Sequence, residues 1–226
     1  MIKIIDLDRL FDKYIEGYVF KNVGKIKPEE IENKIPVLYE EFGNEKSGDL
    51  DGKTPNEYYR QFTTYEQLFA LKEHIEKDVP VSDFLIEAIT ADKTAEKVVL
   101  DELKKDENEV YTAYLMNILS DLKGEIPVSR YLEFALLDYP ENIGELATEA
   151  LCENADKAKS AVILAYSYAD EDKKSRLTEI LSNVKEKSDD VFDKLLEEFV
   201  AHKKQIPMYA GYLAKIEFLT HCLAKG

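Results

Sequence analysis

The sequence has few of the residues that tight turns, disulfides and membrane spans require. Its 226 residues include 9 glycines, 7 prolines, 2 cysteines and no tryptophan. A β-sandwich or β-barrel needs more glycine and proline for its turns, whereas helical hairpins need little of either. No apolar run in the sequence approaches the roughly 20 residues of a transmembrane helix. These absences favour an all-α protein that does not span a membrane.

The two cysteines give no sign of a disulfide framework. Cys152 and Cys222 are 70 residues apart, each within a segment whose pattern is helical. Such sparse cysteine is typical of a reducing compartment. Residues 1–11 alternate charged and apolar side chains and lack the uninterrupted apolar run of a signal peptide. We therefore expect a cytoplasmic protein.

Basic residues are scarce relative to acidic ones. The chain carries 46 Asp and Glu against 30 Lys and Arg, a formal net charge of -16. Nucleic-acid binders need a basic face, and anionic membrane surfaces repel acidic proteins, so we expect neither partner. The charge is compatible with a basic protein or peptide partner, and equally with an acidic surface that serves solubility alone.

What the sequence does contain is apolar residues at three- and four-residue spacing, the pattern of amphipathic helices. Leu7, Leu10, Phe11 and Tyr14 begin the first such stripe, which predicts a helix over residues 7–20. The other expected helices include one that begins at Pro28, a short one over residues 37–42 after Pro36, and helices over residues 94–105, 109–122, 140–154, 158–168, 173–184, 191–202 and 207–223.

A polar, glycine-rich loop over residues 44–53 separates two parts of the chain. Clusters of glycine, serine and aspartate between periodic segments are typical of loops. The sequence therefore predicts an N-terminal helical module of residues 1–43 and a second domain of residues 54–226.

Capping signals mark the starts of four helices in the second domain. Thr54-Pro55-Asn56-Glu57 places a cap, a first-turn proline and a third-position glutamate in order, and Thr64-Tyr65-Glu66-Gln67 repeats the capping pattern. Ser82 and Ser129 each follow a proline by two residues, and we expect both to cap the next helix.

Two segments 47 residues apart are similar to each other. Val79-Pro80-Val81-Ser82-Asp83-Phe84-Leu85 is echoed by Ile126-Pro127-Val128-Ser129-Arg130-Tyr131-Leu132, and more weakly by Ile206-Pro207-Met208. Helices at this period resemble HEAT and armadillo repeat proteins over residues 64–226. The resemblance implies a short, irregular α-α superhelix whose faces bind other macromolecules and usually carry no chemistry.

The 44–53 loop contains two motifs with possible chemistry. Asp49-Leu50-Asp51-Gly52-Lys53-Thr54 resembles the nucleophile motif of haloacid-dehalogenase-type phosphatases, but residues 44–48 cannot form the strand that precedes it there. Ser47, Asp49 and Asp51 also resemble a calcium loop, but Tyr58 stands where a bidentate glutamate is required. A turn into a capped helix explains the loop better, and whether it binds a cation stays open.

Few other residues suggest chemistry. The histidines are His74, His202 and His221, and the last shares a helix face with Glu217, but two ligands do not make a metal site. We expect surface or half-buried histidines. The sequence has no phosphate-binding glycine loop and no nucleophile elbow. We therefore expect no metal, no cofactor and no catalytic residue.

The strongest functional signal is an acidic stretch over residues 132–172, which contains ten Asp and Glu residues and two lysines. Three of the glutamates line one face of the helix expected over residues 140–154. Like charges at four-residue spacing cost about 0.2–0.5 kcal/mol each, which either a basic partner or simple solvation would explain. Tyrosine is enriched at interaction surfaces. The candidate interaction surface comprises Asp138, Tyr139, Glu141, Glu145 and Glu149.

These observations favour a non-enzymatic module whose acidic, tyrosine-bearing helical face binds another protein or a basic peptide. The alternative is an enzyme with a pocket between the N-terminal module and the helical stack, since domain junctions are common pocket locations. A junction closed by Leu10, Phe11 and Tyr58 would favour the module. The oligomeric state and the exact repeat boundaries stay open.

Overall fold

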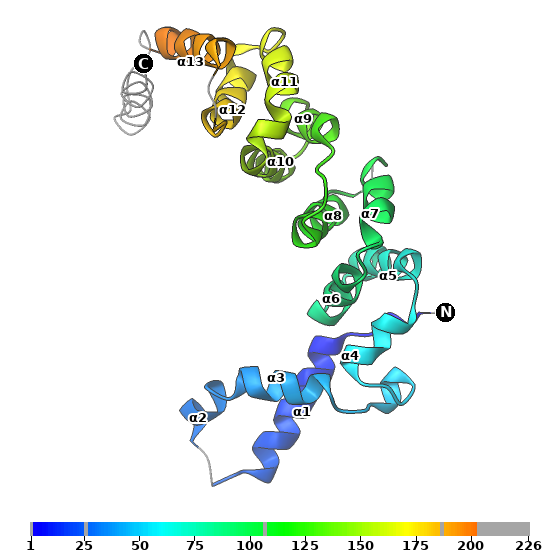
Figure 1. The fold of residues 1–226 in the computed structure, drawn as a ribbon. Helices are drawn as coiled ribbons and strands as arrows, with labels where there is room; N and C mark the ends of the chain where they lie inside the picture. Colours follow the sequence, from blue (N-terminus) through cyan, green and yellow to red (C-terminus); the bar gives the residue numbers. More distant parts are fainter. Residues whose placement is uncertain (1, 25–26, 106–107, 186–187, 203–226) are drawn as a thin grey trace. The chain divides into compact units, whose positions relative to one another are not determined.

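The computed structural model describes residues 2–24, 27–105, 108–185 and 188–202, and within these ranges the chain is all-helical (Figure 1). Thirteen α-helices and two short 3-10 helices make up these ranges, without a strand among them, which confirms the all-α class. None of the helices in this part of the chain is long and apolar enough to cross a membrane.

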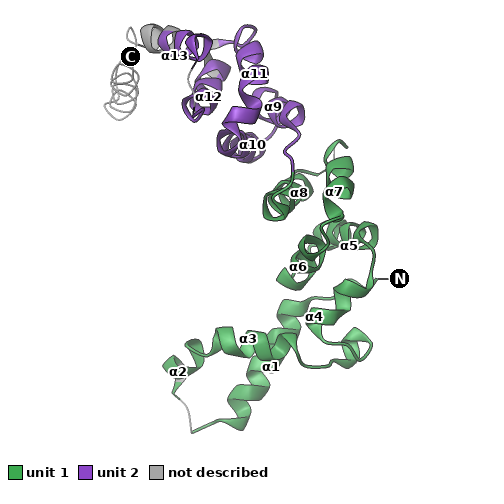
Figure 2. Cartoon of the chain, in the orientation of Figure 1, with its two compact units in different colours: residues 1–124 green, residues 125–226 purple. Residues whose placement is uncertain are grey.

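The chain forms two compact units, residues 1–124 and residues 125–226 (Figure 2). The boundary between them does not coincide with the one that we expected at residues 44–53, because that loop lies inside the first unit. The expected helix over residues 207–223 and the echo at residues 206–208 lie outside the described residues.

The described residues of unit 1 form eight α-helices and both 3-10 helices. Their bounds are α1 Leu7–Lys21, α2 Pro28–Glu32, α3 Ile35–Gly43, η1 Gly48–Leu50, α4 Pro55–Tyr58, η2 Tyr59–Gln61, α5 Thr64–Glu76, α6 Asp83–Ala91, α7 Ala95–Leu103 and α8 Glu109–Leu122. Helix α5 packs against α6, α7 and α8, and its buried face includes Leu68, Ala70 and Leu71. This face repeats at helical spacing, as a core-facing stripe should.

A cluster of aromatic rings joins α1 and α3 to α6. The ring of Phe11 lies edge-on to Tyr39 at 4.9 Å, and Tyr39 stacks on Phe84 at 5.1 Å. Phe42 lies against both Phe11 and Phe84. Each such aromatic pair contributes about 0.5–1.5 kcal/mol beyond the area that it buries. The N-terminal helices are therefore packed onto the rest of unit 1 at the place where the alternative, enzymatic interpretation puts a pocket.

Unit 2 is built from five helices in its described residues. They are α9 Val128–Leu136, α10 Glu141–Glu153, α11 Ala155–Tyr166, α12 Glu171–Ser182 and α13 Asp189–His202. Helix α10 packs against α9 and α12, and α11 packs against α9, α12 and α13. Leu151, Val162 and Leu177 are fully buried between them. The contact of α10 with α12 brings together two helices that are separated in the sequence by α11.

Two of the four expected caps are observed, at Thr54 and Ser82, and two are not. Thr54 forms the expected capping box with Glu57. The cap of α5, however, is Thr63 and not Thr64: Thr63 forms a capping box with Glu66, while the hydroxyl of Thr64 donates to Asp92 at 3.0 Å. The expected starts of these helices were otherwise correct to within a few residues.

The two similar segments begin their helices differently. Ser82 caps α6 by accepting a hydrogen bond from the backbone N–H of Phe84 at 3.2 Å. Ser129 does not cap α9, because that helix already begins at Val128, after Pro127. The carbonyl oxygen of Pro127 accepts from the backbone N–H of Tyr131 at 3.0 Å, which is the first bond of the helix. The prediction of a cap at Ser129 is therefore wrong.

This difference can be tested by a pair of alanine substitutions. Ser82→Ala should lower the free energy of unfolding by about 1 kcal/mol, because a buried N-cap is lost. Ser129→Ala should change it by no more than about 0.5 kcal/mol, because an exposed residue inside a helix is replaced by a better helix former. Urea unfolding monitored by circular dichroism measures both. Equal losses in the two variants would contradict the assignment of the caps.

Candidate functional site

A groove of about 600 Å³ lies between α10 and α12 in unit 2. Each helix contributes side chains at three- and four-residue spacing, which places them on one face. The lining residues are Glu145, Thr148, Glu149 and Cys152 from α10, and Arg176, Glu179 and Asn183 from α12 and its C-terminal cap. Two of the five residues of the predicted surface, Glu145 and Glu149, thus lie in this groove.

Three carboxylates give the groove its charge. Glu145, Glu149 and Glu179 are exposed. Among the described residues, none of the ion pairs within 4.0 Å involves these three glutamates. Since carboxylates attract cations most strongly where walls exclude part of the solvent, the groove is suited to a positively charged group.

Arg176, a cationic side chain in the groove lining, has a structural role. Arg176 donates from Nη1 to the carbonyl oxygen of Ala135 at 2.8 Å, close to the end of α9. Carbonyls in the last turn of a helix lack partners within it, so a guanidinium there supplies a donor that the helix needs. The guanidinium also passes close to α10: a Cβ atom at Gly144 would lie 2.7 Å from Nη1. Gly144 therefore gives Arg176 the space to reach Ala135.

The predicted surface residues do not all share one environment. Asp138 and Glu141 are exposed beside the start of α10 but do not line the groove. Tyr139, which belongs to the predicted interaction surface, is half-buried and not exposed. Its ring lies edge-on to Phe134 at 4.9 Å, and its hydroxyl accepts a hydrogen bond from Arg130 at 3.2 Å.

The half-burial of Tyr139 has a local cause. The guanidinium of Arg130 lies 4.4 Å from the centre of the Phe134 ring and 5.6 Å from that of Tyr139, and it also pairs with Glu133 at 2.8 Å. Cation–π contacts of this kind hold the tyrosine against α9. Tyr139 thus fixes the turn between α9 and α10.

Sequence reasoning missed the contribution of α12. Arg176 and Glu179 are three residues apart and so share a helix face, which the sequence does show. What it does not show is that this face lies opposite α10. The pairing depends on α11 turning the chain back, which is a property of tertiary packing.

The thiol of Cys152 is poorly suited to nucleophilic chemistry. Burial raises its pKa to about 11, and the nearby carboxylate of Glu179 adds to the effect. Only the thiolate is a strong nucleophile, and catalytic cysteines have lowered pKa values. The groove therefore holds a protonated thiol at neutral pH.

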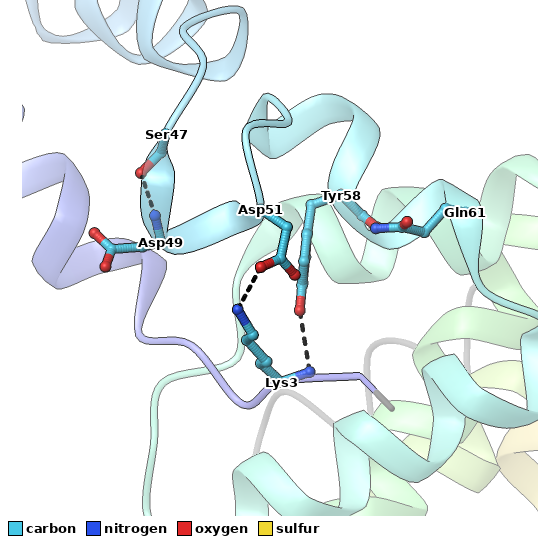
Figure 3. Close-up of polar contacts among 6 residues, drawn as sticks. All are labelled: Lys3, Ser47, Asp49, Asp51, Tyr58 and Gln61. Atoms are coloured by element: carbon cyan, nitrogen blue, oxygen red, sulfur yellow. Dashed lines mark hydrogen bonds and ion pairs between the residues drawn. The ribbon is translucent and has the colours of Figure 1, made fainter.

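The 44–53 loop binds a lysine side chain through one of its aspartates (Figure 3). The carboxylate of Asp51 accepts from the ammonium of Lys3 at 2.6 Å, and the backbone N–H of Lys3 donates to the hydroxyl of Tyr58 at 3.0 Å. Figure 3 shows Asp49 pointing away from Asp51. The two carboxylates thus do not converge, as the phosphatase and calcium-loop motifs would require.

His74 is buried rather than half-exposed, so our expectation for the histidines is wrong at this position. It belongs to the inner face of α5, one turn after Leu71 and two turns after Gln67, both buried. That spacing was the signal that could have placed it. The side chains of His202 and His221 lie outside the part that the structure describes.

Within the described ranges, no three His, Cys, Asp or Glu side chains lie close enough together to hold a metal ion. Comparison with family models, with curated proteins and with solved structures finds no match to this chain.

The state of the Cys152 thiol can be tested by alkylation in a Cys222→Ser background. Because its pKa is raised to about 11, the rate of labelling by iodoacetamide should rise roughly tenfold per pH unit up to pH ~10 without levelling off. Peptide mass spectrometry follows the labelling. A plateau near pH ~9, the behaviour of an ordinary thiol, would contradict the burial described for this side chain.

Proposed function

We propose that this protein is a non-enzymatic interaction module that binds a basic segment of another protein along α10 and α12. The observation that carries the proposal is the groove between these helices, with Glu145, Glu149 and Glu179 exposed along it. Glu141 and Asp138 extend the same charge beyond the groove. A lysine- or arginine-bearing segment would neutralise carboxylates that repel one another in the free protein.

The chemistry of the groove supports binding more than catalysis. Its thiol has a raised pKa, and its arginine already donates to the carbonyl of Ala135. The competing interpretation, an enzyme with a pocket between the N-terminal helices and the stack, needs open space near α3 and α6. Tyr39, Phe42 and Phe84 fill part of that region with stacked and edge-on rings. Tyr58 is also buried, and Leu10 and Phe11 are half-buried.

We further propose that the helices from α5 onward are an irregular array of the HEAT-like kind. Two features support this: the similar segments at Val79 and Ile126, and the packing of each following helix on its neighbours within its own unit. Arrays of this kind present extended faces built from successive helices, which suits a peptide or protein ligand. The acidic balance of the chain disfavours nucleic acid and anionic membranes as partners, and we place the protein in the cytoplasm.

A charge-reversal variant tests the proposal directly. Glu141→Lys, Glu145→Lys and Glu149→Lys in one chain should weaken binding of a fluorescent lysine- and arginine-rich helical peptide about tenfold, since three weak pairs of about 0.5 kcal/mol each are lost. The same variant should fail to capture the partners that the parent chain captures from a cell lysate. Fluorescence anisotropy at low and high salt measures the peptide affinity.

A matched control carries the same change of charge on unit 1. Glu40, Glu76 and Glu87 are exposed, and changing all three to lysine alters the net charge equally without touching α10. This control should lose much less affinity than the α10 variant. If the two variants bind alike, or if the captured proteins are the same for the α10 variant and its parent, the α10–α12 face is not the binding surface.

A further inference from the structure

His74 ties the end of α5 to the segment that leads into α6. Its Nδ1 lies 2.9 Å from the carbonyl oxygen of Pro80, and its backbone carbonyl accepts from the N–H of Val79 at 2.9 Å. A carbonyl oxygen can only accept, so Nδ1 carries the proton and donates. The neutral ring therefore presents Nε2 as an acceptor.

The acceptor side of the ring faces a phenol. Nε2 lies 3.5 Å from the hydroxyl of Tyr59, and the side-chain amide of Gln67 donates to the backbone carbonyl of Tyr59 at 2.9 Å. The other amide atom of Gln67, Oε1, is buried without a hydrogen-bond partner among the described residues. The network thus joins η2, α5 and the α5–α6 segment around a ring that has no exposed surface.

Protonation of the ring conflicts with this arrangement. Both nitrogens then donate, so the Tyr59 hydroxyl would have to turn and accept from Nε2, and a charge stands in a site without solvent contact. Burial lowers the pKa of His74 and outweighs the hydrogen bond that the ring donates to Pro80, which raises it. The charge is relieved only when the ring reaches water, and the ring is tied to Pro80. Exposing it therefore opens the segment of residues 77–82.

The charged neighbours of the ring do not remove this conflict. Asp6, before α1, favours the protonated form, and Lys77, at the end of α5, opposes it. The buried side chains of α6 and α7, which pack against α5, are all uncharged. Those of α8 include one titratable group, the phenol of Tyr111 beneath Lys72.

The backbone of this segment is strained at Asp78. Asp78 has a φ of 53°, in the left-handed region that residues with a Cβ atom disfavour. Its neighbour Val79 is held by the carbonyl of His74, and Pro80 is held by the ring of the same residue. Losing the ring contact leaves a strained turn with one of its two anchors.

We propose that His74 makes the α5–α6 connection an acid-sensitive joint: in mildly acidic solution the segment of residues 77–82 opens while the helices of unit 2 remain closed. A histidine that is easier to protonate in the open state than in the closed state stabilises the closed state above its ordinary pKa of 6.5. It loses that contribution as the pH falls below this value.

Hydrogen exchange of the full chain tests the joint. The protection factor of the Val79 amide should fall by up to about tenfold between pH ~7.5 and ~5.5. Tenfold is the limit when only the open state takes up one proton and the pH lies about one unit below the ordinary histidine pKa. The amides of α10, a helix without histidine, should keep their protection. In His74→Gln the side chain still has a donor for Pro80 but does not titrate, so the protection of Val79 should no longer depend on pH.

Two further measurements test whether His74 is the group that responds to pH. The double variant His202→Gln and His221→Gln removes the other imidazoles and should leave the response of Val79 unchanged. If His74→Gln does not fold, an NMR titration of the His74 ring in the parent chain replaces it, with an expected midpoint below 6.5. A midpoint at or above this value, or a Val79 amide whose protection does not change, overturns the proposal.

Discussion

Each backbone carbonyl in the segment between two helices needs a hydrogen-bond donor. The donor that it finds decides where the next helix begins. At Pro80 the donor is the ring of His74, so the proline stays outside α6 and Ser82 becomes the cap. At the equivalent Pro127 the donor is the backbone N–H of Tyr131, so the helix starts earlier. Residue 121, which corresponds to His74 at the 47-residue spacing, is an exposed aspartate and carries no donor for a carbonyl.

The same requirement shapes unit 2 around its groove. The carbonyl of Ala135, near the end of α9, takes its donor from Arg176 of α12. The guanidinium reaches that carbonyl beside Gly144, where a Cβ atom would lie 2.7 Å from Nη1, and α12 itself packs against α10. The glutamates of α10 and α12 then lie beside one another at the surface. A part-buried hydrogen bond from α12 to α9 thus lies beside the surface where these carboxylates gather, which connects the packing of the unit to its proposed function.

The sequence predicted the helices well because amphipathic periodicity and caps are local. It placed α8 at its observed bounds and found the capping box at Thr54. It failed where a distant partner decided the outcome. Ser129 does not cap its helix, because no His74 equivalent holds Pro127, and Tyr139 is half-buried, because Arg130 binds it. The acidic face of α10 was visible in the sequence, but the share of α12 in the groove was not, because it depends on how α11 folds back.

We propose that a basic ligand lies along α10 and α12. The most direct measurement is a map of backbone amide shifts in the 15N-labelled full chain during titration with a lysine- and arginine-rich helical peptide. We expect the largest shifts on residues around Glu145, Glu149 and Glu179, and we expect them to diminish as salt screens the charges. Shifts spread evenly over the acidic residues of both units, or concentrated in unit 1, would contradict this proposal.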